Sequence, residues 1–240
     1  MKTFDYLKQS FFFFRQNFRD IATIQLPFLI LLNALALWLD MNASETEDFR
    51  QTALSISLLS LVLMPIYWAA TILYMQSKLE NRPLQPFQAI SLSFKYWKTL
   101  LFIFILTALA ISGGLLLLII PGIYIGIRLS FADYIGVVEG KSAWASLKQS
   151  WEETDDYFWV LLQGLLILYP TLQLVEIPIT QYFTNQEDRS MLLELPIVVF
   201  LDLLSALITV YGFRIYCVMR EEIRPESYND RPKAIDDQNP

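Results

Sequence analysis

The sequence predicts an all-α, polytopic membrane protein with six transmembrane helices and with amphipathic interfacial helices before spans 1, 3 and 5. Composition indicates this class, because 55% of the 240 residues are apolar, 18% are charged and the mean hydropathy is +0.40. The apolar residues are also gathered into runs. A helix needs about 20 residues to cross a hydrocarbon core of about 30 Å. The chain can therefore hold several spans and no soluble catalytic domain.

Composition also excludes several kinds of catalytic site. The chain has no histidine and one cysteine, Cys217. The usual zinc ligand sets, His-dependent nucleophilic triads and an intramolecular disulfide are therefore excluded. We expect a non-enzymatic protein with no cofactor, no metal centre and no nucleic-acid partner.

The chain opens with an amphipathic segment at residues 2–19. Apolar residues recur there at spacings of three and four, which places them on one helical face. They are Phe4, Leu7, Phe11, Phe14 and Phe18. With its four basic residues, the segment is predicted to be a helix that lies in the membrane interface.

The first span is predicted at about residues 21–39. Its Ala34-Leu35-Ala36 resembles a signal-peptidase site, which leaves a cleaved signal peptide as the alternative. The basic region before it is long and aromatic for a signal peptide, so we favour a retained span.

Apolar runs predict five more spans. They cover about 53–75, 99–119, 121–138, 157–179 and 191–217. Residues 100–138 could also form one helix, but its length of ~58 Å would far exceed the bilayer. Two spans joined at Pro121-Gly122, a dipeptide typical of a tight turn or kink, fit better.

Two further interfacial helices are predicted at about 86–97 and 142–155, before the third and fifth spans. Residues 1–218 would then form a single transmembrane domain. The tail at 219–240 is polar and contains proline, so we expect it to be disordered and cytoplasmic.

The distribution of basic residues predicts the orientation of this layout. Of the 18 Lys and Arg residues, 15 lie in segments on the side of the two termini. The opposite side has Arg50 and Arg189, and Arg128 lies within a span. Because Lys and Arg are retained on the cytoplasmic side, both termini are predicted to be cytoplasmic in a bacterial inner membrane.

A weak repeat is shared by the three amphipathic segments. Its pattern is an aromatic residue, an aliphatic residue three places on, a serine three places further and a second aromatic residue. The copies are Phe4-x-x-Leu7-x-x-Ser10-Phe11, Phe87-x-x-Ile90-x-x-Ser93-Phe94 and Trp144-x-x-Leu147-x-x-Ser150-Trp151. We predict that the two outer aromatic residues of each copy anchor it in the interface. A fourth match, at Tyr124-x-x-Ile127-x-x-Ser130-Phe131 inside a span, leaves true repetition and compositional bias both open.

One stretch of the sequence resembles a known group of bacterial membrane proteins. The resemblance rests on Pro121-Gly122-Ile123-Tyr124, Arg128, Glu139 and Ala145-x-Leu147-x-x-Ser150-Trp151-x-x-Thr154. The group includes the YciC-like inner-membrane family and the membrane domain attached to some glycerophosphodiester phosphodiesterases. Length, the six-span layout and the lack of a phosphodiesterase domain favour the YciC-like branch. The resemblance implies an inner-membrane protein with no assigned biochemical role and no catalytic residues.

Charged residues within the spans are the candidates for chemistry. They are Arg128, Asp133, Glu176, Glu194, Asp202 and Arg214. A charge at the bilayer centre costs roughly 2.5 to 3.5 kcal/mol, so such side chains usually face the bundle interior and pair. Depth along the spans predicts that Arg128 pairs with Asp202, and Asp133 with Arg214. Structural pairing and an ion or substrate path both remain open.

Two classes of function are compatible with the sequence. The favoured one is a non-enzymatic membrane component that binds lipids or another membrane protein through its interfacial aromatic helices. The alternative is a small transporter or channel that uses Arg128 and Asp202. The spans contain few polar residues and show no inverted repeat of broken helices, which favours the first class.

Overall fold

The computed structural model describes residues 2–42, 46–185 and 190–223, and every regular element in these ranges is a helix. Five helices are long and apolar enough to span a membrane. They are α1 (Lys2–Asn42), α2 (Thr46–Leu79), α4 (Trp97–Leu117), α8 (Phe158–Thr184) and α9 (Met191–Ile223). The shorter elements are α3 (Pro86–Ser93), α5 (Ile119–Arg128), α6 (Ala132–Val138), α7 (Ala143–Glu153) and the 3-10 helix η1 (Asp155–Tyr157). The prediction of an all-α protein with several apolar spans is confirmed.

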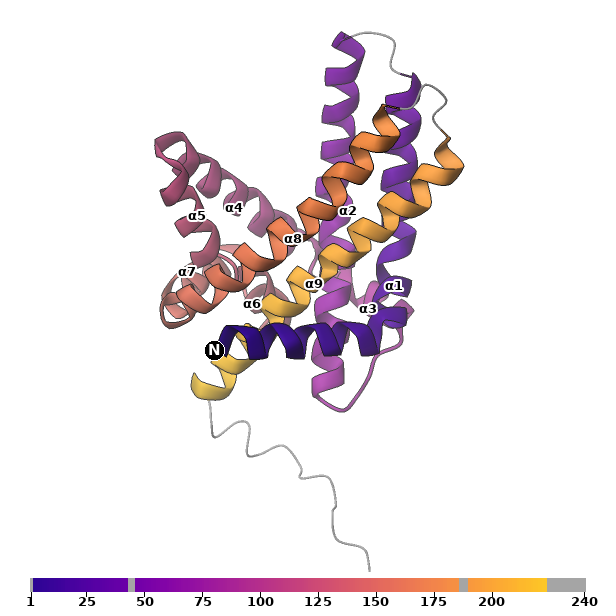
Figure 1. Cartoon of the computed structure of the whole chain (residues 1–240). Coiled ribbons are helices and arrows are strands. Elements are labelled where there is room, and N and C mark those ends of the chain that lie inside the picture. The colour runs from indigo at the N-terminus through magenta and orange to yellow at the C-terminus, as the bar shows by residue number, and fades with distance from the viewer. Residues whose placement is uncertain (1, 43–45, 186–189, 224–240) are drawn as a thin grey trace, which may run out of the picture.

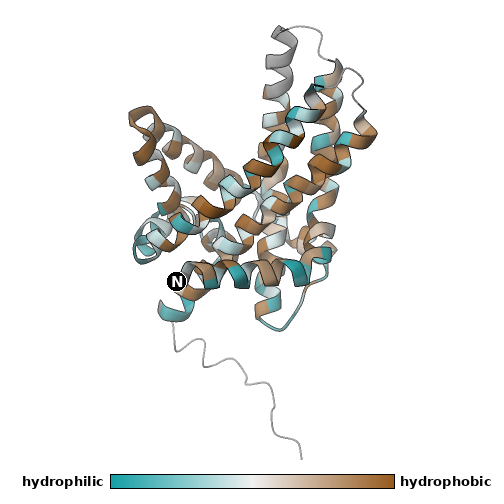
Figure 2. Cartoon of the chain, in the orientation of Figure 1, coloured by the Kyte–Doolittle hydropathy of each residue, from teal (hydrophilic) through white to brown (hydrophobic). Residues whose placement is uncertain are grey.

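The long helices form hairpins that point the same way. In Figure 1 the N-terminus, α3, α7 and the last turns of α9 lie towards one end of the molecule. The other end holds the C-terminal ends of α1 and α8, the N-terminal ends of α2 and α9, and the turn between α4 and α5. Figure 2 shows the long helices as mainly hydrophobic, with hydrophilic residues concentrated at the end of the molecule where the N-terminus lies. We call the end that carries α3 and α7 the basal end.

The predicted interfacial helix at 2–19 and the predicted span at 21–39 belong to one continuous helix, α1, which changes direction along its length. The first part of α1 lies crosswise to its remainder (Figure 1). Within α1 the Thr23 hydroxyl donates a hydrogen bond to the Arg19 carbonyl, 2.8 Å away. Such bonds often bend helices. Tyr74 of α2 holds this region, because its hydroxyl donates to the Asp20 carboxylate at 2.5 Å.

The predicted fourth span at 121–138 is not one helix. Residue Leu118 is extended and α5 begins at Ile119, two residues before the predicted turn at Pro121-Gly122. The helix then stops at Arg128, and α6 starts at Ala132. Pro121 fits at the third helical position of α5, where a missing backbone N–H removes no intrahelical bond.

Helices α2, α8 and α9 extend past the predicted spans at 53–75, 157–179 and 191–217 through mainly polar end residues, whereas α4 ends two residues before the predicted limit of 119. Helix α3 ends at Ser93, before the predicted limit of residue 97, while α7 covers most of 142–155. Helix α9 continues to Ile223, so the predicted disordered tail cannot begin at 219. Residues 224–240 lie outside the described part of the chain.

The core lies where the basal halves of the hairpins meet. Aromatic residues fill it, and the largest of its fully buried side chains are Tyr74, Tyr211, Tyr216 and Phe131. The Tyr211 hydroxyl of α9 donates to the Val160 carbonyl of α8 at 2.6 Å. This contact requires a glycine in α8, because a Cβ added at Gly164 would lie 2.1 Å from the Tyr211 ring.

Candidate functional site

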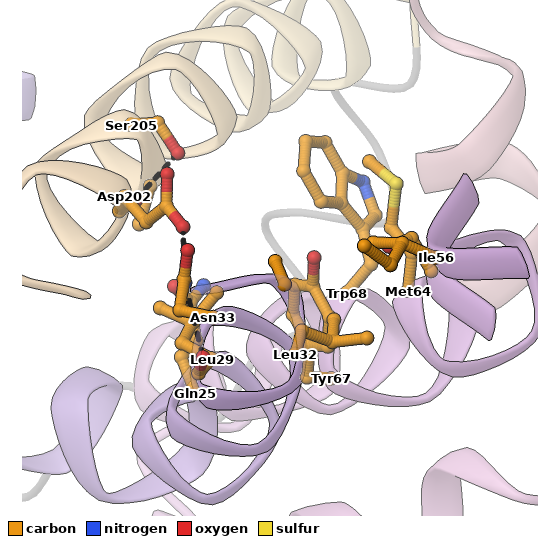
Figure 3. A pocket seen from close by; sticks show the side chains of 13 residues that line it. Gln25, Leu29, Leu32, Asn33, Ile56, Met64, Tyr67, Trp68, Asp202 and Ser205 are labelled. Carbon is orange, nitrogen blue, oxygen red and sulfur yellow. Dashed lines mark hydrogen bonds between the residues drawn. The ribbon is translucent and has the colours of Figure 1, made fainter. Parts of the chain in front are cut away.

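A polar cavity lies between α1, α2 and α9, and we call it the Asp202 cavity (Figure 3). Its volume is about 240 Å³. Six lining side chains carry polar oxygen atoms: Gln25, Asn33, Ser60, Tyr67, Asp202 and Ser205. The remaining wall is apolar or aromatic and includes Leu29, Leu32, Ala36, Ile56, Met64 and Trp68. The cavity therefore combines one formal charge, several neutral polar groups and an apolar wall.

Asp202 is held by a neutral partner. Its carboxylate accepts a hydrogen bond from Asn33 Nδ2 at 2.6 Å, and the same amide also donates to the Leu29 carbonyl at 3.0 Å (Figure 3). Within the described ranges no Lys or Arg side chain forms an ion pair with Asp202. A carboxylate removed from water without a counter-charge is costly, so the cavity is suited to a cation.

Thr71 links two residues that line the cavity, Gln25 and Tyr67, to each other. Gln25 Nε2 donates to the Thr71 hydroxyl at 3.2 Å, which in turn donates to the Tyr67 carbonyl at 2.8 Å. Sequence analysis missed Gln25, Asn33 and Tyr67. The signal was present in part, because Gln25 and Asn33 are polar residues eight apart on one face of an apolar helix.

Asp133 lies in a second cavity, of about 230 Å³, among α2, α4, α5, α6, α8 and α9. Its Oδ2 accepts from Trp68 Nε1 at 2.6 Å, and its Oδ1 accepts from the Tyr134 backbone N–H at 3.0 Å. The hydroxyls of Thr107 and Thr209 line this cavity and have no hydrogen-bond partner in the described part of the chain. Trp68 lines both cavities and so forms the wall between the two carboxylates.

The predicted Arg128–Asp202 pair is wrong. Arg128 is only 6% exposed, and its guanidinium pairs with Asp155 at the start of η1. The guanidinium carbon also lies 5.1 Å from the Trp151 ring centre and 5.8 Å from that of Tyr124. The depth estimate failed because it treated 121–138 as one helix, whereas α5 ends at Arg128 beside α7.

The predicted Asp133–Arg214 pair is also wrong. Arg214 Nε donates to Gln9 Oε1 at 2.9 Å, and Arg214 Nη1 lies 4.0 Å from Glu221. Arg214 therefore joins α9 to the first part of α1. Of the other two charges, Glu176 accepts from Gln173 Nε2 at 3.0 Å, and Glu194 is buried at the start of α9.

Arg214 borders a groove of about 290 Å³, which we call the Arg214 groove. It lies between the first part of α1 and the basal ends of α2 and α9. Its lining is mainly apolar and includes Phe12, Phe13, Met75, Leu79, Val210 and Phe213. The groove thus places a guanidinium beside an apolar surface.

The three amphipathic motifs have the same burial pattern. The first aromatic residues, Phe4, Phe87 and Trp144, have exposed fractions from 69% to 73%. The last aromatic residues, Phe11, Phe94 and Trp151, are exposed as well. The serines between them, Ser10, Ser93 and Ser150, are at most 1% exposed. The fourth match differs, because Phe131 at its last position is fully buried. Burial therefore distinguishes the three amphipathic copies from the fourth match, which ends in the break between α5 and α6.

Among the described residues, no group of three or more His, Cys, Asp or Glu side chains could hold a metal ion. The one cysteine, Cys217, is buried. The arrangement is instead suited to binding, with two carboxylate-containing cavities inside the bundle and exposed aromatic residues at its basal end.

Comparison with known proteins adds a family match. Residues 31–218 match the model of an uncharacterised protein family, UPF0259. A UPF0259 membrane protein of Photorhabdus laumondii is 31% identical over 133 residues, which cover 55% of this chain and 50% of the relative. Another, from Sodalis glossinidius, is 30% identical over 164 residues, 64% of this chain and 60% of the relative. The chain thus spans about half to three fifths of these relatives. No solved structure matches.

Proposed function

Because this chain belongs to the UPF0259 family of membrane proteins, we propose that it is a non-enzymatic, multi-pass protein of the bacterial inner membrane that binds phospholipid at its basal end. The single observation that carries the proposal is the shared burial pattern of the three amphipathic motifs. Each motif buries its serine and exposes its two aromatic residues. Aromatic side chains presented in this way are suited to the boundary between headgroups and acyl chains.

The Arg214 groove supports a phospholipid as the ligand. Its apolar lining can receive part of an acyl chain, and the Arg214 guanidinium can donate two parallel hydrogen bonds to a phosphate. The groove lies against the first part of α1, whose Phe4, Phe11 and Phe12 are exposed. A lipid bound there would contact the groove and the interfacial helix together.

The orientation is part of the proposal. We propose that the basal end faces the cytoplasm, because 15 of the 18 basic residues lie in the segments assigned to that side. In this layout, α4 enters the membrane at the position of the predicted third span, and α5 with α6 leads back at the position of the fourth. Both termini are then cytoplasmic. We also propose that the chain is related to the membrane domain of some glycerophosphodiester phosphodiesterases.

Lipid retention tests the function directly. The full chain is purified in mild detergent, and its bound phospholipid is measured by native mass spectrometry. We expect wild-type protein to retain phospholipid and the Arg214→Gln variant to lose most of it, because the amide has no charge for the phosphate. Lys148→Gln is the matched control, since Lys148 is an exposed basic residue of α7 away from the groove. Equal retention by Arg214→Gln and wild type, or no retained phospholipid in wild type, would contradict the proposal.

A second candidate function, a small transporter or channel, is favoured by one observation. The two cavities meet at Trp68, and each contains a carboxylate hydrogen-bonded to a neutral donor. Such a pair of cavities is compatible with a path for a cation through the bundle.

A further inference from the structure

We propose that the Asp202 cavity is a binding site for a small organic ammonium ion. This function goes beyond phospholipid binding, since the cavity lies between α1, α2 and α9 inside the bundle and shares no lining residue with the Arg214 groove. Four properties of the cavity carry the inference: its charge, its size, its polar groups and its aromatic wall.

The charge of the cavity selects a cation. Asp202 is the only formally charged residue that lines it. Its carboxylate accepts a hydrogen bond from Asn33, but within the described residues no Lys or Arg side chain pairs with it. A bound cation would supply the missing counter-charge where the surroundings are apolar and the attraction is strong.

The size of the cavity favours an organic cation over a bare metal ion. A water molecule occupies about 30 Å³ in the liquid, so a cavity of about 240 Å³ has room for several. A dehydrated metal ion needs several oxygen ligands within roughly 2.0 to 2.6 Å. The one carboxylate and the neutral oxygen-bearing side chains line a cavity of about 240 Å³, which is too large to hold them all that close to one ion. An ammonium ion that carries a few carbon atoms fills the volume better.

The lining also matches the two parts of such a ligand. In Figure 3, Asp202 and Trp68 lie on opposite sides of the open space. The ammonium group can donate to Asp202 and to the neutral oxygens of Asn33 and Gln25, while the rings of Tyr67 and Trp68 attract a cation by their π electrons. The carbon atoms can contact the apolar wall, which includes Leu32, Ala36 and Met64.

A binding experiment with butylammonium chloride tests the proposal. Binding to the purified full chain is measured by isothermal titration calorimetry, with sodium chloride at matched ionic strength as the reference. We expect wild type to bind butylammonium, and Asp202→Asn to weaken the binding by about tenfold or more, because the charge partner is lost. Glu176→Gln is the matched control, since Glu176 is a carboxylate of α8 outside the cavity, and it should bind as wild type does.

A cavity-filling variant keeps the test decisive if Asp202→Asn does not fold. Ala36→Leu adds volume to the cavity wall and leaves the charge intact, so it should weaken butylammonium binding by a similar factor. Loss of binding in Asp202→Asn or in Ala36→Leu, with retention in Glu176→Gln, supports the site. Unchanged binding in both cavity variants, no butylammonium binding by wild type, or equal binding of sodium would overturn it. Phospholipid retention is measured in parallel, and it should be unchanged in all three variants.

Discussion

At the scale of single residues, a glycine in α9 allows Tyr134 to reach the backbone of that helix. The Tyr134 hydroxyl donates to the Thr209 carbonyl at 3.0 Å, and a Cβ added at Gly212 would lie 2.4 Å from that hydroxyl. Tyr134 is buried among other aromatic residues and has little room to move.

We therefore predict that Gly212→Ala destabilises the protein by about 1 to 3 kcal/mol through overpacking. The measurement is the thermal unfolding midpoint in detergent. Gly113→Ala is the matched control, because nothing lies within 4 Å of its added Cβ. Alanine also has the higher helix propensity, so the control should not lower the midpoint. A midpoint for Gly212→Ala equal to that of wild type would contradict this packing.

The candidate site could be predicted only in part at this scale. Asp133 and Asp202 were identifiable because they are charged residues within apolar runs. A charge in a span usually needs a hydrogen-bond or ion-pair partner inside the bundle. Their partners, Trp68 and Asn33, were not identifiable, since neutral donors carry no charge pattern along the sequence. Depth along a span shows neither where a helix breaks nor which way a side chain points, which is why both predicted ion pairs were wrong.

At the scale of elements, the break between α5 and α6 is stabilised by α7. The Ser150 hydroxyl accepts from the Phe131 backbone N–H at 3.1 Å and donates to the Arg128 carbonyl at 2.9 Å. Thr154 Oγ1 lies 3.2 Å from the same carbonyl and shares its one proton between this carbonyl and that of Ser150, 2.5 Å away. Backbone groups freed by a helix break need partners where water is absent, and these two side chains supply them.

Replacing Ser150 with alanine should thus leave two buried backbone groups with weaker or no partners. We predict that Ser150→Ala destabilises the protein by about 1 to 3 kcal/mol. The measurement is the free energy of unfolding, obtained by titrating the protein in mild detergent with a denaturing detergent. The equivalent serines are matched controls, because Ser10 and Ser93 bond only to carbonyls within four residues of themselves. Equal losses of unfolding free energy in the three serine variants would show that the Ser150 hydrogen bonds to Arg128 and Phe131 contribute no stability.

The sequence indicated a turn near Pro121 because proline and glycine mark turns locally. It did not indicate the break at residues 129–131, since the groups that satisfy this break come from α7, about 20 residues further along the chain. Local patterns therefore predicted the hairpin of α4 and α5, while long-range hydrogen bonds determined how α5 ends.

At the scale of the whole molecule, three hairpins share one direction, and each follows an amphipathic motif. The amphipathic motifs and the apolar runs predicted the order of these elements, but not that the first motif and the first apolar run would form one helix, α1. The turn between α4 and α5 is notable among the described residues, because residues 115–120 are all apolar and exposed. Leu116, for example, is 89% exposed.

This apolar turn does not affect the predicted sidedness. Helix α4 leads away from the basal end, and α5 with α6 leads back to it (Figure 1). The chain thus returns to the same side whether or not the turn reaches the far surface of the membrane. Exposed apolar side chains are stable in hydrocarbon, so we expect the turn to lie within the lipid.

Cysteine accessibility tests the central claim, that the three hairpins enter the membrane from a cytoplasmic basal end. Single cysteines are placed in a Cys217→Ser background and treated with an impermeant maleimide in intact and in permeabilised cells. Ser190→Cys should react in intact cells, Ser142→Cys only after permeabilisation, and Leu117→Cys in neither case. Reaction of Ser142→Cys in intact cells would contradict the account, because α7 would then lie outside the cytoplasm.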